Sequence, residues 1–140
     1  MYVRRSLDLL RTRGHRLTQT RKTILQALDQ ANRPMSPYEI QRSLHEQGRR
    51  LDHVTIYRTL ELLCANGLAH RVTSVGGFVR CHLDDEAGCH RYMVCRRCGS
   101  LHEFADEALC DREDEATRSF GFRTEQHVAE SLGLCANCHE

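Results

Sequence analysis

Two cysteine pairs, one past the middle of the 140-residue chain and one near its end, most constrain its fold. Cys95-x-x-Cys98 is followed by Gly99, and 36 residues separate it from Cys135-x-x-Cys138. Two such pairs supply four thiolates, which fill the tetrahedral coordination of one structural zinc ion. The pattern therefore predicts a zinc site that ties the end of the fold to its middle and contributes folding free energy. The alternative, a thioredoxin-like redox motif, explains one pair but not two.

Charge and cysteine are distributed unevenly, although the formal net charge is only +1. Residues 1–80 contain 14 basic and 6 acidic residues, a net charge of +8, whereas residues 81–140 contain 6 and 13, a net charge of −7. Every basic residue except Lys22 is an arginine, whose planar guanidinium group suits phosphate. Seven of the eight cysteines lie in residues 81–140. We therefore predict an anion-binding domain over residues 1–80 and a metal-binding domain over residues 81–140.

The first domain is predicted to contain helices and one hairpin. Apolar residues at helical spacing indicate helices near residues 6–13, 18–31, 36–47 and 52–65. Thr18 is a typical helix cap, and Ser36 with Glu39 forms a capping box around Pro37. Two short apolar runs, 68–72 and 78–81, flank a Gly-Gly pair and predict a β-hairpin. Helices followed by such a wing are typical of a winged helix-turn-helix.

The second domain is predicted to be a small α/β unit, so the fold class is α+β. A polar loop over residues 82–91 leads to strands at 92–94 and 101–104. Asp106 caps an acidic helix that reaches about residue 120, and a last strand covers residues 127–134.

The fourth helix is the candidate DNA-reading element. Ile56, Leu60 and Leu63 share its inner face, so Arg58 faces outward with Thr55 and Tyr57 beside it. Arginine reads guanine in the major groove, whereas arginines outside this helix are expected to bind phosphate. The alternative is a solvated helix face. The predicted DNA-binding residues are Arg16, Arg21, Tyr38, Thr55, Tyr57 and Arg58.

Several metal-ligand side chains remain outside the four-cysteine site. They are His70, Cys81, Cys89, His90, His102, Glu103, Cys110 and His127. Any one of them alone is more simply a solvated side chain, but together they predict at least one further metal site that draws on both halves of the chain. Cys64 lies on the core side of the fourth helix and is expected to serve packing.

Other classes of protein fit the sequence poorly. No run of 18 apolar residues exists and the N-terminus lacks the apolar core of a signal peptide, so we expect a cytoplasmic protein with reduced thiols and no membrane partner. The sequence contains no HExxH motif, nucleophile elbow or phosphate loop. Pro34 and Pro37 are its only prolines, so the deaminase motif P-C-x-x-C is missing. We expect no enzymatic activity and no small-molecule substrate.

Four segments resemble the ferric uptake regulator (Fur) family of bacterial metal-sensing repressors. They are Arg16–Arg21 (RLTQTR), Val54–Leu60 (VTIYRTL), Cys95–Gly99 together with Glu103, and the terminal Cys135-x-x-Cys138. The resemblance implies an N-terminal winged helix and a C-terminal α/β dimerisation domain. It also implies a homodimer that binds a palindromic double-stranded DNA operator when loaded with metal, and so represses metal-homeostasis genes.

Within this family the chain is most similar to the zinc uptake regulator (Zur) branch. That resemblance implies a regulatory zinc site formed by His70, Cys81, His90 and Glu103, with Cys89 as the competitor of His90. Iron and peroxide sensors typically have histidines where this chain has Pro34 and Tyr92. A thiolate ligand also suits zinc better than iron. An iron, nickel or peroxide sensor is the alternative within the family, and a zinc enzyme or thiol redox protein is the alternative outside it.

The resemblance also suggests an auxiliary metal site. Other relatives have two histidines, a glutamate and a late histidine there, and the matching positions of this chain include Cys89, Cys110 and His127. These three residues form a candidate third zinc site, in addition to one structural and one regulatory zinc per subunit. The alternative is a pair of ordinary cysteines open to oxidation.

Overall fold

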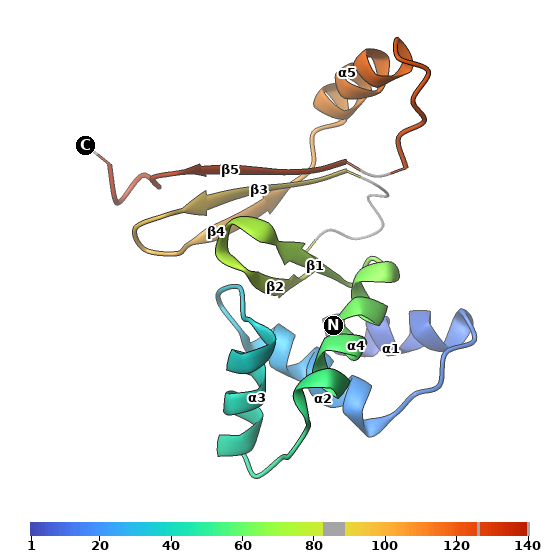
Figure 1. Cartoon of the computed structure of the whole chain (residues 1–140), viewed down its shortest axis with the longest axis vertical. Helices are drawn as coiled ribbons and strands as arrows, with labels where there is room; N and C mark the ends of the chain where they lie inside the picture. The colour runs from blue at the N-terminus through green and yellow to red at the C-terminus, as the bar shows by residue number, and fades with distance from the viewer. Residues whose placement is uncertain (83–88, 126, 140) are drawn as a thin grey trace. The chain divides into compact units, whose positions relative to one another are not determined.

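The chain folds into two compact units, Met1–Cys81 and His82–Glu140, each considered by itself. The computed structural model describes residues 1–82, 89–125 and 127–139 (Figure 1). Helices with a hairpin wing come first and a small α/β unit follows, so the predicted α+β class is confirmed. No helix in the described part of the chain is long and apolar enough to cross a membrane.

The first unit contains four helices and a hairpin. The helices are α1 (Tyr2–Thr12), α2 (Gln19–Gln30), α3 (Pro37–Glu46) and α4 (His53–Ala65). The hairpin consists of β1 (Ala69–Val72) and β2 (Gly77–Arg80), joined by the short 3-10 helix η1 (Thr73–Val75). The predicted caps are confirmed: the Thr18 hydroxyl accepts from the Arg21 amide, and Ser36 and Glu39 form the capping box.

Apolar side chains from all four helices and the hairpin form the core of this unit. Its fully buried members include Leu10, Ile24, Leu25, Leu28, Ile40, Ile56, Leu60 and Leu63. The Tyr2 hydroxyl donates a 2.8 Å hydrogen bond to the Leu68 carbonyl, which fixes α1 to the start of the hairpin. Burial raises the pKa of this phenol.

Gly77 allows the hairpin to approach the segment before α3. Met35 and Phe78 exchange backbone hydrogen bonds of 3.0 and 2.8 Å, which form an isolated bridge. A Cβ atom at Gly77 would lie 2.8 Å from Pro34 Cβ and 2.9 Å from the Met35 backbone nitrogen. Only glycine therefore permits this close packing.

The second unit is a three-stranded sheet with one helix. Its elements are β3 (Cys89–Cys95), β4 (Leu101–Phe104), α5 (Glu107–Arg118) and β5 (His127–Gly133). The strand order is β4-β3-β5, with β3 antiparallel to β4 and parallel to β5 (Figure 1). The Asp106 carboxylate caps α5 by accepting a 3.1 Å hydrogen bond from the Leu109 amide, as the sequence predicted.

The structure corrects the prediction for the start of this unit. The loop predicted over residues 82–91 ends earlier, because β3 begins at Cys89; residues 83–88 lie outside the described part of the chain. The reason is the pairing with β5, which runs from Cys89 opposite His127 to Cys95 opposite Gly133. Pairing with β5 provides hydrogen-bond partners for the backbone of this segment, although its polar sequence lacks the apolar alternation typical of a strand.

Candidate functional site

The four cysteines of the two Cys-x-x-Cys pairs come together at one end of the sheet. Their sulfur atoms all lie within 4.8 Å of one another. Cys95 is the last residue of β3, and β5 ends opposite it at Gly133. The Arg96 amide donates a 2.9 Å hydrogen bond to the Gly133 carbonyl, so the two cysteine-bearing turns start side by side. Parallel pairing of β3 with β5 thus brings together two Cys-x-x-Cys motifs that are far apart in sequence.

The charges of these thiols favour a cation among them. Amide N–H groups of Cys98 and Cys135 lower the pKa of Cys95 to about 5, and the Ser100 hydroxyl lowers the pKa of Cys98. A hydrogen bond with the neighbouring Cys135 thiol raises the pKa of Cys138 to about 12. A bound divalent cation would replace the protons that the crowded thiols otherwise share. Four sulfur donors in this arrangement fit structural zinc.

The wing of the first unit carries one histidine and one cysteine on the same face. His70 in β1 pairs with Val79 in β2, and Cys81 lies two residues after Val79. Residues two apart on a strand point to the same side. The ligand atoms of His70 and Cys81 lie within 4.8 Å of each other, and both residues are buried.

The second unit carries a histidine and a glutamate in contact. His90 Nδ1 in β3 lies 3.0 Å from Glu103 Oε2 in β4, and the Tyr92 hydroxyl donates a 3.2 Å hydrogen bond to the same oxygen. The His82 amide donates to Oε1 at 2.8 Å. The Glu103 side chain is fully buried. A buried carboxylate held by polar hydrogens is a suitable oxygen ligand for a metal.

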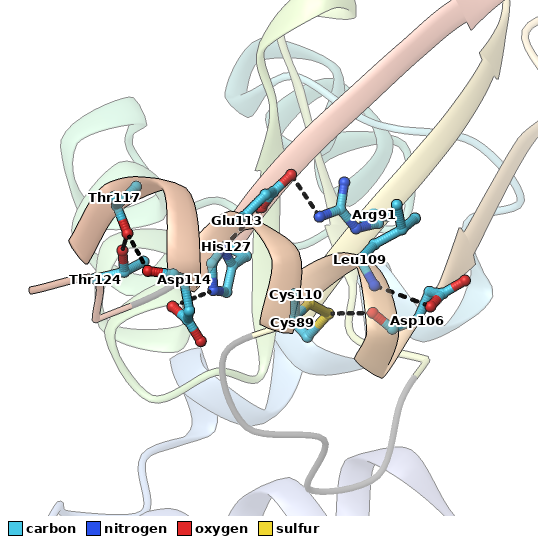
Figure 2. A network of polar contacts seen from close by, with 10 residues as sticks. All are labelled: Cys89, Arg91, Asp106, Leu109, Cys110, Glu113, Asp114, Thr117, Thr124 and His127. Atoms are coloured by element: carbon cyan, nitrogen blue, oxygen red, sulfur yellow. Dashed lines mark hydrogen bonds and ion pairs between the residues drawn. A yellow bond between two sulfur atoms is a disulfide. The ribbon is translucent and has the colours of Figure 1, made fainter. Parts of the chain in front are cut away.

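The residues of the candidate third zinc site make other contacts in this structure. Cys89 and Cys110 are joined by a disulfide. His127 instead contacts two carboxylates, with Nδ1 2.8 Å from Glu113 and Nε2 3.0 Å from Asp114 (Figure 2). Sequence reasoning missed both carboxylates, although their positions three and four residues after Cys110 place all three on one helix face.

The predicted DNA-binding residues lie on the first unit with different exposures. Arg58 is exposed on α4, and Arg16 is exposed before α2, where its carbonyl accepts a hydrogen bond from the half-buried Arg21 guanidinium. Thr55 is half-buried, and its carbonyl accepts the Thr59 hydroxyl. Tyr57 is half-buried against the core, with its ring edge-on to Phe78 at 6.5 Å.

Tyr38 lies on α3 and exposes 64% of its surface. Its ring stacks on His53 at the first position of α4, with ring centroids 4.1 Å apart and an angle of 23° between the planes. Sequence reasoning did not select His53, since contact between α3 and α4 was not visible in the sequence. The stack fixes an exposed aromatic ring close to the start of the candidate reading helix.

The sequence and fold are similar to those of known regulators. Residues 12–131 match the ferric uptake regulator family. The zinc uptake regulation protein of Escherichia coli K12 is 33% identical over 129 residues, covering 91% of this chain and 75% of that protein. The ferric uptake regulation protein of Pseudomonas aeruginosa is 37% identical over 119 residues, covering 84% and 88%.

A solved structure of a zinc uptake regulator complexed with zinc and DNA has a TM-score of 0.88 and 29% identity. The match covers 96% of this chain and 91% of that one. The resemblance inferred from the motifs is confirmed. The chain therefore belongs to the ferric uptake regulator family, and it is a DNA-binding, metal-responsive transcriptional regulator and not an enzyme.

Proposed function

We propose that this protein is a zinc-responsive repressor of metal-homeostasis genes, which acts in the cytoplasm as a homodimer on a palindromic operator. The observation that carries the proposal is a pair of metal-ligand side chains in each unit: His70 with Cys81, and His90 with Glu103. Two nitrogens, one sulfur and one carboxylate oxygen fill the four positions that zinc prefers. We assign Cys95, Cys98, Cys135 and Cys138 to a separate structural zinc ion.

Zinc is favoured over iron by the donors available to the regulatory site. Cys81 supplies a thiolate ligand, which suits zinc better than it suits iron, whose sites in this family are built from nitrogen and oxygen ligands. Tyr92 stands where iron and peroxide sensors of the family often have a histidine, and its hydroxyl donates to Glu103. Tyr92 therefore acts as a support for the Glu103 carboxylate.

The proposed mechanism is a difference in metal affinity between conformations. A zinc ion that takes two ligands from each unit restricts the motion of one unit relative to the other. If the restricted arrangement is the one that binds DNA, zinc must raise DNA affinity and DNA must raise zinc affinity by the same factor. The four-cysteine site belongs wholly to the second unit, so it serves the fold and not the response.

The surfaces of the two units support the remaining parts of the proposal. The basic first unit exposes Arg58 and Tyr38, and the solved relative with zinc and DNA supports the assignment of DNA as partner. In the second unit β5 lies at an edge of the described sheet and exposes Val128 and Leu132, which a second copy of the chain could cover. We assign Arg16, Arg21 and Arg58 to DNA contacts, with Tyr38, Thr55 and Tyr57 beside them.

The test is DNA selection followed by metal titration. A random double-stranded library is selected on the full-length protein with zinc, and the recovered sequence is then titrated by fluorescence anisotropy under zinc, iron(II) and nickel(II). We expect a palindromic sequence that is bound at the lowest free concentration of zinc. Stronger activation by iron(II) or nickel(II) would favour the alternative sensors, and DNA binding that ignores all three metals would contradict the proposal.

A further inference from the structure

Helix α5 is attached to its sheet by very little apolar surface. Five of its twelve residues are acidic, and Cys110 is its one buried residue. Leu109 leaves 43% of its surface exposed. A helix that buries so little apolar surface gains little stability from packing. Other contacts must therefore hold α5 in place.

Those contacts are one disulfide and a group of ion pairs at the start of β3 and β5 (Figure 2). The disulfide joins Cys89, the first residue of β3, to Cys110. Glu113 contacts Arg91 at 2.6 Å and His127 at 2.8 Å, and Asp114 contacts His127 at 3.0 Å. The Arg91 guanidinium lowers the pKa of Glu113 by hydrogen bonding. Both carboxylates are more than a third exposed, so water and salt weaken these ion pairs and leave the disulfide as the principal link.

We propose that Cys89 and Cys110 are a reversible thiol–disulfide pair whose oxidation by a peroxide fixes α5 to the sheet and whose reduction releases it. This inference goes beyond the proposed function and does not depend on it. The structure represents the oxidised form. The four cysteines of the other cluster take no part, since they are grouped separately at the opposite end of β3.

The two cysteines differ in access, which assigns their roles. Cys89 is half-buried, whereas Cys110 is buried with 7% of its surface exposed. A peroxide therefore reaches Cys89 first.

Oxidation takes two steps and balances. The Cys89 thiolate attacks one oxygen of hydrogen peroxide, so that an S–O bond forms, the O–O bond breaks and the leaving hydroxide takes a proton to become water. The Cys110 thiolate then attacks the Cys89 sulfur, so that the S–S bond forms, the S–O bond breaks and the leaving hydroxide takes a proton to become water. Two electrons pass from the cysteines to the peroxide. A dithiol reductant returns them and is itself oxidised to a disulfide.

The experiment compares reduced and oxidised zinc-loaded full-length protein. The protein is reduced with a dithiol, freed of it and exposed to hydrogen peroxide; free thiols are then alkylated and disulfides are mapped by mass spectrometry. Hydrogen exchange is followed in peptides covering residues 107–118, with α2 as the internal reference. Cys110→Ser removes the pair, and Cys64→Ser is the matched control because Cys64 is a half-buried cysteine of the other unit.

We expect peroxide to produce a Cys89–Cys110 peptide that the dithiol reverses. Hydrogen exchange in α5 should be at least about tenfold slower in the oxidised form than in the reduced form, for the parent and for Cys64→Ser alike. In Cys110→Ser, exchange in α5 should be fast with or without peroxide. Alkylation of both cysteines after peroxide, a disulfide that resists the dithiol, or equal exchange in the two forms would overturn the proposal. A zinc ion bound to the two reduced thiols that blocks their oxidation would also overturn it. The comparison within the parent decides the matter even if Cys110→Ser fails to fold.

Discussion

Tyr92 and Glu103 lie opposite each other on β3 and β4, and the Tyr92 hydroxyl donates a 3.2 Å hydrogen bond to Glu103 Oε2. His90 contacts the same oxygen at 3.0 Å. One carboxylate oxygen thus contacts polar groups of two residues of a single strand. A ligand held in this way loses little conformational freedom when it binds a metal, because its orientation is already fixed.

Loss of one cysteine from the four-sulfur cluster should unfold the second unit. Cys95→Ser or Cys138→Ser leaves three sulfur ligands around zinc, and a unit this small depends on its metal for folding free energy. We expect elemental analysis to find less zinc per chain, and circular dichroism to show thermal unfolding at a lower temperature than in the parent. Cys64→Ser is the control and should change neither, since Cys64 lies in the first unit. A folded Cys95→Ser protein with the parent zinc content would contradict the assignment.

Zinc binding to the four cysteines should release protons and weaken in acid. Cys138, with its pKa raised to about 12, is protonated at neutral pH and must lose its proton to bind zinc. Cys95, with its pKa lowered to about 5, is already a thiolate and becomes protonated only when the pH falls through that value. Calorimetry at pH 7 in buffers of different ionisation enthalpy should therefore show net proton release, and zinc affinity should fall as the pH is lowered toward 5. A heat that does not depend on the buffer would contradict these charge states.

Arg58 and Arg16 should affect DNA binding in different ways. Arg58→Ala should cost about 1–3 kcal/mol on the selected sequence and little on random DNA, because base contacts carry the sequence information. Arg16→Ala should weaken binding to both and reduce the salt dependence, as expected for a phosphate contact. Anisotropy at several salt concentrations measures both effects, with Arg112→Ala of α5 as the control. Equal losses on both DNAs for Arg58→Ala would assign Arg58 to the phosphate backbone.

Gly77→Ala should destabilise the first unit by about 1–3 kcal/mol, the usual cost of a side chain forced into a packed position. The added Cβ would meet Pro34 at 2.8 Å. Gly133→Ala is the control, because no atom of the described residues lies within 4 Å of its Cβ position. Urea unfolding followed by circular dichroism compares the two variants. Equal stability of Gly77→Ala and the parent would show that the turn before α3 can move away at little cost.

The sequence predicted the parts of the fold that depend on local signals. The caps at Thr18, Ser36 and Asp106 each depend on residues within one helical turn, so their positions were predicted correctly. The length of β3 was not predicted, because it depends on pairing with a strand that begins 32 residues after β3 ends. The local pattern around Cys89 is polar and carries no strand signal.

The same distinction holds for the candidate sites. The two Cys-x-x-Cys pairs identified the four-sulfur cluster, since their spacing alone specifies the chemistry. Spacing did not reveal that Cys89 and Cys110 form a disulfide, because a bond between two cysteines depends on where β3 and α5 meet in space. The half-buried position of Tyr57 and the stack of Tyr38 on His53 likewise depend on packing between elements.

Zinc is proposed to act through His70, Cys81, His90 and Glu103. The most direct test of this proposal is the zinc dependence of operator binding by Cys81→Ser and Glu103→Gln at constant protein concentration, with Glu125→Gln, an exposed glutamate outside the cluster, as the control. We expect both ligand variants to keep the fold, the dimer and the structural zinc but to lose zinc-dependent binding, while the control matches the parent. Binding of the operator by Cys81→Ser at the same free zinc concentration as the parent would contradict this assignment and place the response elsewhere in the protein.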